Sequence, residues 1–440
     1  MKRLITDQLL AWKNQETKKP LIVRGTRQVG KSWSIVDFGK TFFPGQVLVV
    51  DLEKHPDWHR VFEPNLDARR IIEELEILLN TRITPGKDLL FIDEIQECPK
   101  AIMALRYFYE QLPDLHVIAA GSLLEFALQD ISFPVGRVQM IHMYPMNFGE
   151  FLWATNQPML ADIILTSPKP QSEAVHDRLM DELRKYLFIG GMPECVNTYA
   201  GTGSMTAVFE VQNDLVHAFR QDFSKYAPYS DKRCLMSVLS SVATKVGQQT
   251  KYAHLAEGFT NPTITKAYDL LCSAWVFYKI SAASGSGLPF ASTASEKVFK
   301  TLLTDIGLMR SLSNLSSDID MLSDDLLALY RGALAEQFVG QEFLSAGQDL
   351  YYWSRQAKSS LAEVDYLMDK NGKIYPVEVK SGPSGKLRSL HLFLKSYPDC
   401  PKGFVLSGAN FETLPEQKLE FVPLYFAYGL KTAGDFSTSL

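Results

Sequence analysis

The sequence predicts an α/β protein: a parallel sheet first, then a helical middle region, then a second α/β region. Short apolar runs that suit buried strands occur at residues 21–23, 47–50, 89–92 and 115–120. Amphipathic segments lie between them. A glycine-containing loop follows the first of these runs, and strand-like alternation returns after residue 350. Apolar runs separated by helices are typical of parallel strands that helices cover on both faces.

Length and composition place the chain among ordinary globular proteins. Its 440 residues favour two or three domains, and its net charge of -5 neither indicates nor excludes a nucleic-acid partner. The five cysteines lie far apart and form no C-x-x-C pair, which argues against a zinc site or a disulfide framework and fits a reducing cytoplasm. No apolar run reaches membrane-spanning length and residues 1–19 lack an apolar signal core, so we expect no membrane association.

Residues 25–32 read G-T-R-Q-V-G-K-S, a complete match to the phosphate-binding loop pattern G-x-x-x-x-G-K-[ST]. In such a loop, backbone N–H groups at a helix N-terminus surround the phosphates of ATP. Lys31 is expected to reach the β- and γ-phosphates, and the Ser32 hydroxyl to bind Mg²⁺. The alternative is a surface glycine turn. The expected nucleotide contacts are Gly25, Thr26, Arg27, Gln28, Val29, Gly30, Lys31, Ser32 and Trp33.

Residues 89–94 read L-L-F-I-D-E, four apolar residues followed by two acids. This pattern fits a Walker B strand, in which Asp93 holds Mg²⁺ and Glu94 polarises the attacking water. The alternative is a strand that ends in a solvated acidic turn.

The run at residues 115–120 ends at Gly121-Ser122. In the additional-strand class of P-loop ATPases, a polar side chain at this position lies between the Walker A and Walker B strands. Ser122 is therefore a candidate sensor of the γ-phosphate or the attacking water. Its alternative role is to cap the helix that follows.

In order along the chain, G-T-R-Q-V-G-K-S, F-I-D-E-I-Q, A-G-S-L-L and Y-P-M-N-F-G-E-F resemble the AAA+-like ATPases grouped with archaeal-type ATPases. The resemblance implies an ATPase domain over residues 1–151 and a companion C-terminal region. It also implies that Arg137, in the pair Gly136-Arg137, acts as an arginine finger toward a neighbouring subunit. A homo-oligomer, such as a ring, would then be required; the alternative is an ordinary surface arginine.

Residues 152–326 are expected to form a helical lid and a winged-helix domain. Two helices at 235–246 and 264–272 precede candidate strands at 275–280 and 297–303. A winged helix can place its second helix in a DNA groove, where Lys251 and Lys266 would face phosphates. Packing or oligomerisation is the alternative use of such a module.

Residues 327–440 contain a second candidate site. Glu336 lies on an expected helix, Asp365 on a strand, and Glu378 and Lys380 on one face of the next strand. This E…D…E-x-K order resembles the PD-(D/E)XK nuclease core. The resemblance implies that Glu336, Asp365 and Glu378 bind Mg²⁺ and that Lys380 activates water. Phosphate contacts are expected from Arg355, Lys358, Lys386, Arg388 and Lys395. The alternatives are a salt-bridged strand pair or an inactive fold kept for docking.

Together these features predict an ATP-binding and ATP-hydrolysing protein that couples turnover to DNA binding, remodelling or metal-dependent cleavage. The alternative is a STAND-like nucleotide switch that docks a protein partner, with an inactive nuclease-like C-terminal fold.

Overall fold

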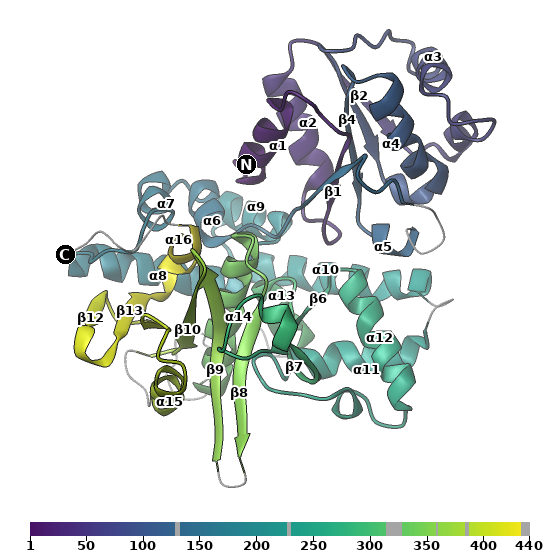
Figure 1. Cartoon of the computed structure of the whole chain (residues 1–440). Coiled ribbons are helices and arrows are strands. Elements are labelled where there is room, and N and C mark those ends of the chain that lie inside the picture. Colours follow the sequence, from purple (N-terminus) through teal and green to yellow (C-terminus); the bar gives the residue numbers. More distant parts are fainter. Residues whose placement is uncertain (128–132, 227–229, 314–327, 358–359, 383–386, 433–440) are drawn as a thin grey trace. The chain divides into compact units, whose positions relative to one another are not determined.

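The computed structural model describes residues 1–127, 133–226, 230–313, 328–357, 360–382 and 387–432 (Figure 1). It contains two compact units, one of Met1–Tyr144 with Ser273–Trp275 and one of Pro145–Cys272 with Val276–Leu440. Trp275 lies in the first unit, where its indole N–H donates to Glu125 (3.1 Å). The expected boundary at residue 151 lies close to the observed one. The middle and C-terminal regions share one sheet and form one compact unit, so the expected division at residue 326 stays a prediction.

The first unit alternates strands and helices. In chain order its strands and α-helices are α1 (Ile5–Lys13), β1 (Leu21–Arg24), α2 (Lys31–Phe42), β2 (Val47–Asp51), α3 (Ala68–Leu79), β3 (Leu89–Asp93), α4 (Pro99–Gln111), β4 (His116–Gly121), α5 (Leu124–Ala127) and β5 (Gln139–His142).

The five strands form a parallel sheet in the order β2-β3-β4-β1-β5. Strand β4 therefore lies between β1, which leads into the phosphate-binding loop, and β3, which ends in Asp93. This confirms the predicted parallel sheet and places the Ser122 segment between the two nucleotide motifs. The carboxyl ends of parallel strands are where α/β sheets bind ligands.

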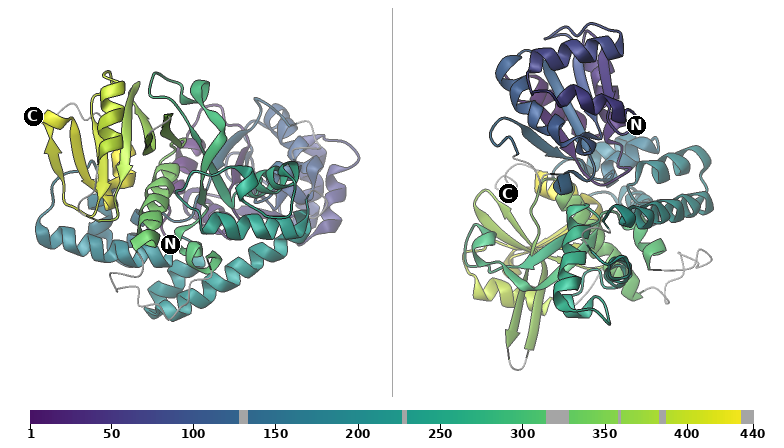
Figure 2. Two further views of the ribbon diagram at one scale, coloured as in Figure 1. Left: turned by 90° about the horizontal axis from the view of Figure 1, so that it is seen from below. Right: turned by 90° about the vertical axis from the view of Figure 1, so that its right-hand side faces the viewer.

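Helices cover both faces of this sheet (Figure 2). Leu21 and Val23 of β1 face α1 and α2, whereas Ile22 faces the side covered by α3 and α4. The same alternation along β3 buries both of its faces, which explains why the strand reads as a continuous apolar run.

The second unit is built on one eight-stranded mixed sheet, whose strands lie in the order β12-β13-β11-β10-β9-β8-β6-β7. Its strands are β6 (Phe277–Ala282), β7 (Ser295–Leu303), β8 (Tyr351–Ala357), β9 (Ser360–Lys370), β10 (Lys373–Val379), β11 (Gly403–Ser407), β12 (Glu412–Leu414) and β13 (Leu419–Pro423). Its α-helices are α6 (Phe148–Ala154), α7 (Pro158–Ile164), α8 (Glu173–Ile189), α9 (Pro193–Thr202), α10 (Met205–Tyr226), α11 (Lys232–Ala243), α12 (Asn261–Ser273), α13 (Ile306–Leu312), α14 (Ala328–Ser345), α15 (Arg388–Ser396) and α16 (Ala427–Thr432). Within the described ranges, no helix has both the length and the apolar composition needed to cross a bilayer.

Helices α11 and α12 and the antiparallel pair β6–β7 lie where a winged helix was expected. The pair is not a free wing, however. Ser281 and Ala282 of β6 pair in parallel with β8, so the two strands extend the sheet of the C-terminal region. The sequence missed this pairing because it joins segments that lie far apart along the chain.

Helix α6 begins with a complete capping box. Asn147 accepts the backbone N–H of Glu150 (2.9 Å), and the Glu150 carboxylate accepts the backbone N–H of Asn147 (3.0 Å). Beside it, Gly191 donates its N–H to Asp305 (2.6 Å) and accepts from Met146 (2.7 Å). The Gly190-Gly191 turn thus has a backbone role.

Candidate nucleotide site and a second carboxylate cluster

The loop between β1 and α2 has the backbone that phosphate binding requires. Gly25 has φ 147°, and an ideal Cβ on it would lie 2.2 Å from the carbonyl oxygen of Met143. Gly30 and Gln28 also have positive φ, 92° and 61°. Such a backbone turns successive N–H groups toward one concavity, which suits an anion.

Lys31 begins helix α2 and is buried, with 7% of its surface exposed. Its ammonium donates to the carbonyl oxygens of Gly25 and Thr26, each at 3.0 Å. Burial lowers the pKa of Lys31 to about 8, against the opposing effect of the nearby Glu94 and Asp93. The loop therefore holds a desolvated cation beside its own backbone, ready for a polyanionic ligand.

The other expected nucleotide contacts differ in environment. Thr26 and Val29 are buried, Arg27 lies 3.9 Å from Glu53 in an ion pair, and the Trp33 side chain is half exposed. The expected contribution of these residues is chiefly their backbone N–H groups, for which side-chain burial is no obstacle.

Arg3 is a loop-supporting residue that the sequence did not reveal. It is buried, and its guanidinium donates to the carbonyl oxygens of Val29 (3.0 Å) and Tyr144 (2.7 Å). One arginine thus joins the phosphate-binding loop to the chain beyond β5. No motif signals this role, because the contacts depend on the fold.

Ser32 and Asp93 come together as the two motifs predict, and the Ser32 hydroxyl lies close enough to the Asp93 carboxylate to affect its pKa. Burial raises the pKa of Asp93, and the Ser32 hydroxyl opposes the rise. A hydroxyl and a carboxylate are oxygen ligands of the kind Mg²⁺ prefers, so these residues fit a nucleotide-bound magnesium ion.

Glu94 follows Asp93 with φ 48°, which turns the chain at the end of β3. Gln96 donates to the Glu94 carboxylate (2.7 Å) and so restrains it. Gln96 also packs on Gly121, where an ideal Cβ would lie 2.5 Å from its amide oxygen. Ser122 is buried, and its hydroxyl has no hydrogen-bond partner among the described residues. Gln96 is a second supporting residue that sequence reasoning missed.

Arg137 lies on the surface, with 48% of its side chain exposed. Its guanidinium donates to Glu110 (3.0 Å), which also accepts from Arg106 at the same distance. These two hydrogen bonds lower the pKa of Glu110, that from Arg137 most. Arg137 is therefore held within its own subunit here.

The second candidate site does gather its four predicted side chains. Glu336 comes from α14, Asp365 from β9, Glu378 from the end of β10, and Lys380 follows it. Lys380 pairs with Glu378 (2.6 Å), and Asp365 accepts the backbone N–H of Val379 (2.8 Å).

The sequence missed the lysine at the centre of this cluster. Lys300 of β7 is fully buried, and its ammonium contacts Glu336 (2.7 Å), Asp365 (3.4 Å) and Glu363. Burial disfavours the charge on Lys300, but these carboxylates outweigh it and hold its pKa well above the usual range. Burial also raises the pKa of Glu336, to about 8, and that of Glu378, to about 7.

This arrangement does not fit the predicted magnesium site. An ammonium with three carboxylate partners lies where the metal was expected, and no group of three or more acidic, histidine or cysteine side chains in the described ranges is arranged to hold a metal ion. The metal-binding role of Glu336, Asp365 and Glu378 therefore stays a prediction, which the Lys300 contacts oppose. Of the expected phosphate contacts, Lys358 and Lys386 lie outside the described residues.

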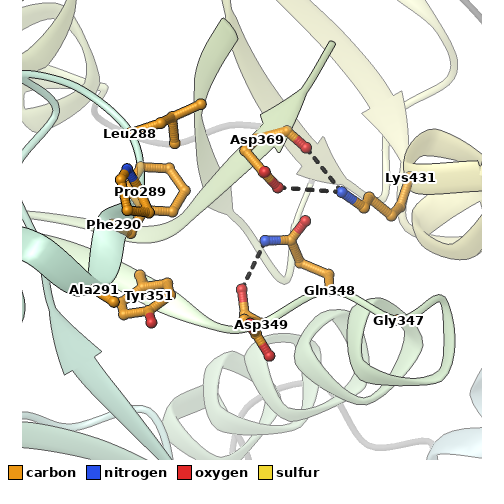
Figure 3. Close-up of a pocket in the computed structure, with 10 residues that line it drawn as sticks. All are labelled: Leu288, Pro289, Phe290, Ala291, Gly347, Gln348, Asp349, Tyr351, Asp369 and Lys431. Carbon is orange, nitrogen blue, oxygen red and sulfur yellow. Dashed lines mark hydrogen bonds and ion pairs between the residues drawn. The ribbon is translucent and has the colours of Figure 1, made fainter. Parts of the chain in front are cut away.

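A pocket of about 560 Å³ lies elsewhere in the second unit (Figure 3). Lys431 pairs there with Asp369 (3.3 Å), and the Gln348 side chain donates to the backbone carbonyl oxygen of Asp349 (2.6 Å). None of the predicted site residues lines it.

Family comparisons divide the chain into three parts. Residues 17–152 match the family model described as an AAA domain. Residues 180–319 and 331–426 match two models described as domains of unknown function, DUF8612 and DUF4143. The first unit is therefore an AAA-type P-loop ATPase domain, whereas the other two matches name no activity.

A protein of Haemophilus influenzae, described as uncharacterized, is 26% identical over 255 residues. The match covers 54% of this chain and 56% of that protein, so the chain spans about half the length of this relative.

Among solved structures, a Walker-type ATPase of Pyrococcus abyssi is similar at 14% identity and a TM-score of 0.46, over 71% of this chain and 95% of the other. RuvB of Thermotoga maritima has 14% identity and a TM-score of 0.30, over 62% and 87%. The ORC1 protein of Aeropyrum pernix, solved in complex with DNA, has 12% identity and a TM-score of 0.30, over 70% and 90%.

Proposed function

We propose that this protein is a magnesium-dependent ATPase whose turnover takes place at the carboxyl edge of the first sheet. The observation that carries the proposal is the convergence of the buried Lys31 ammonium with the neighbouring side chains of Ser32 and Asp93. These groups come from two separate motifs, and the parallel sheet brings them to one edge.

Each residue has a separate role in this proposal. The loop backbone and Lys31 bind and orient the β- and γ-phosphates, while Ser32 and Asp93 hold Mg²⁺. When bound there, Mg²⁺ would neutralise the negative charge on the phosphates. Glu94, restrained by Gln96, orients the attacking water and accepts its proton. Ser122, whose hydroxyl has no hydrogen-bond partner among the described residues, acts as the sensor of the γ-phosphate or water.

ATP turnover by the purified protein tests this assignment. Lys31→Ala should reduce turnover by at least about a hundredfold, because it removes the charge that binds the transferring phosphate. Glu94→Gln should retain ATP binding and lose turnover, so that bound ATP remains unhydrolysed. Normal turnover in Glu94→Gln would remove Glu94 from the water-orienting role.

We also propose that Arg137 acts on a neighbouring subunit of a homo-oligomer. Its half-exposed guanidinium donates one surface hydrogen bond to Glu110 and lies over the Tyr109 ring, and an approaching nucleotide could replace these contacts. Mixing Lys31→Ala with Arg137→Ala should restore part of the turnover that each lacks alone, because one subunit supplies the arginine and the other the intact loop. Arg106→Ala is the matched control, since Arg106 shares the same partner.

We propose that the partner is a protein and that the chain acts as a nucleotide-operated switch that docks it. The β6–β7 pair is part of a large sheet rather than a free wing, and the C-terminal carboxylates already have cationic partners. DNA-coupled remodelling is the second candidate, favoured by two exposed lysines, Lys266 on α12 and Lys251 in the segment before it. Turnover measured with single-stranded, duplex and branched DNA separates them: stimulation by one DNA supports coupling, and unchanged slow turnover supports the switch.

A further inference from the structure

We propose that Lys300 is the resident cation of the C-terminal carboxylate cluster and that it takes the place of a divalent metal, so that this cluster does not carry out metal-dependent cleavage. The inference is independent of the ATPase proposal, because every residue in it belongs to the second unit.

The first step is the match between donors and acceptors. A lysine ammonium has three N–H donors and no acceptor. Lys300 has three carboxylate partners, Glu336 from α14 and Glu363 and Asp365 from β9. Lys300 donates hydrogen bonds to Glu336 and Asp365 and forms an ion pair with Glu363, so one side chain of β7 joins a helix and a strand of the C-terminal region.

The second step is that other protein groups donate to the second carboxylate oxygens of Asp365 and Glu363. Asp365 accepts the backbone N–H of Val379 through its second oxygen (2.8 Å), and Glu363 accepts from the side chain of Gln249 through its second oxygen. A metal ligand in this position would have to give up one of these donors.

The third step concerns space. The second oxygen of Glu336 lies beside Gly247, close enough that an ideal Cβ on this glycine would approach it to 2.5 Å. Gly247 has φ 76°, a conformation that favours glycine. Mg²⁺ usually keeps several water ligands in an octahedral shell, and the Gly247 backbone already lies close to this oxygen on one side.

The fourth step is charge. Lys300 is fully buried at the centre of the cluster, and Lys380 pairs with Glu378 at its edge. Two cations are already distributed among four acids, namely Glu336, Glu363, Asp365 and Glu378. A divalent ion would meet the Lys300 ammonium in a weakly screened interior, where repulsion between like charges is strong.

Binding of Mn²⁺ to the nucleotide-free full chain, followed by the electron paramagnetic resonance signal of free Mn²⁺, tests the proposal. Wild type and Asp365→Asn should give superimposable titrations. Lys300→Ser should gain affinity for Mn²⁺ by at least about tenfold, and Lys300→Ser combined with Asp365→Asn should lose that gain.

Two results would overturn the proposal. One is binding of Mn²⁺ by wild type that Asp365→Asn removes, or cleavage of DNA by wild type that this variant abolishes. The other is an unchanged Mn²⁺ affinity in a Lys300→Ser protein that circular dichroism shows to be folded. If Lys300→Ser does not fold, the comparison of wild type with Asp365→Asn decides alone.

Discussion

The buried ammonium of Lys31 gives the nucleotide-free protein a stability that depends on pH. Burial lowers the pKa of this lysine from 10.5 to about 8 in the folded state. The unfolded chain therefore binds more protons between these two values, and the free energy of unfolding rises with pH across this window. At about 1.36 kcal/mol for each pH unit, the lowered pKa of Lys31 reduces the free energy of unfolding by about 3 kcal/mol in total. The whole of this reduction is present below pH 8.

Substitution by methionine isolates this effect. Methionine keeps much of the length of the side chain and cannot titrate, and the hydrogen bonds it loses to Gly25 and Thr26 change stability by an amount that does not vary with pH. From about pH 7 to about pH 9.5, the free energy of unfolding of wild type should therefore rise relative to Lys31→Met by about 2 kcal/mol. Lys40→Met removes an exposed lysine from the same helix and is the matched control.

Urea unfolding of the nucleotide-free proteins, followed by circular dichroism at each pH, measures the difference. The difference between wild type and Lys31→Met should change with pH, while that between wild type and Lys40→Met should stay constant. Parallel pH profiles for wild type and Lys31→Met would refute the reasoning, because they would show that Lys31 titrates alike in the folded and unfolded states.

Three further substitutions test the contacts that support the phosphate-binding loop and the start of α6. Gly25→Ala should destabilise the protein by about 2–4 kcal/mol in urea unfolding, because its Cβ would meet the Met143 carbonyl, whereas Gly201→Ala in an open part of α9 should be close to neutral. Arg3→Met should raise the KM for ATP at least about tenfold and leave the second unit folded, since it removes two charge-assisted hydrogen bonds that fix the loop; an unchanged KM would contradict this role. Asn147→Ala should lower the free energy of unfolding by about 1–2 kcal/mol through loss of the α6 cap, and a change below about 0.3 kcal/mol would show that the cap is not needed.

Much of the nucleotide site could be predicted because each of its two motifs is a short continuous stretch of the sequence. The loop that holds Lys31 is one continuous stretch, and Asp93 and Glu94 end one apolar strand. Their chemistry requires fixed residue types at fixed spacing, so the pattern itself carries the information. The residues that support them, Arg3 and Gln96, follow no such spacing, because any donor that the fold brings to the right place can serve.

The C-terminal cluster shows the opposite case. Its acids stand in the order that a metal-dependent nuclease requires, and they do meet in space. Lys300, which pairs with two of these acids, lies on β7 in a region that the sequence assigns to another domain. Only the pairing of β6 with β8 brings β7 into the same sheet.

The sequence by itself determined the parallel ATPase sheet, the phosphate-binding loop and the acids at the end of β3, because local periodicity and short motifs encode these features. Only the tertiary structure decided that the middle and C-terminal regions form one unit and that a buried lysine lies among the carboxylates. The physical reason is that strand pairing and ion pairing depend on distance in space. Residues as far apart along the chain as Lys300 and Asp365 become partners only when the sheet is complete.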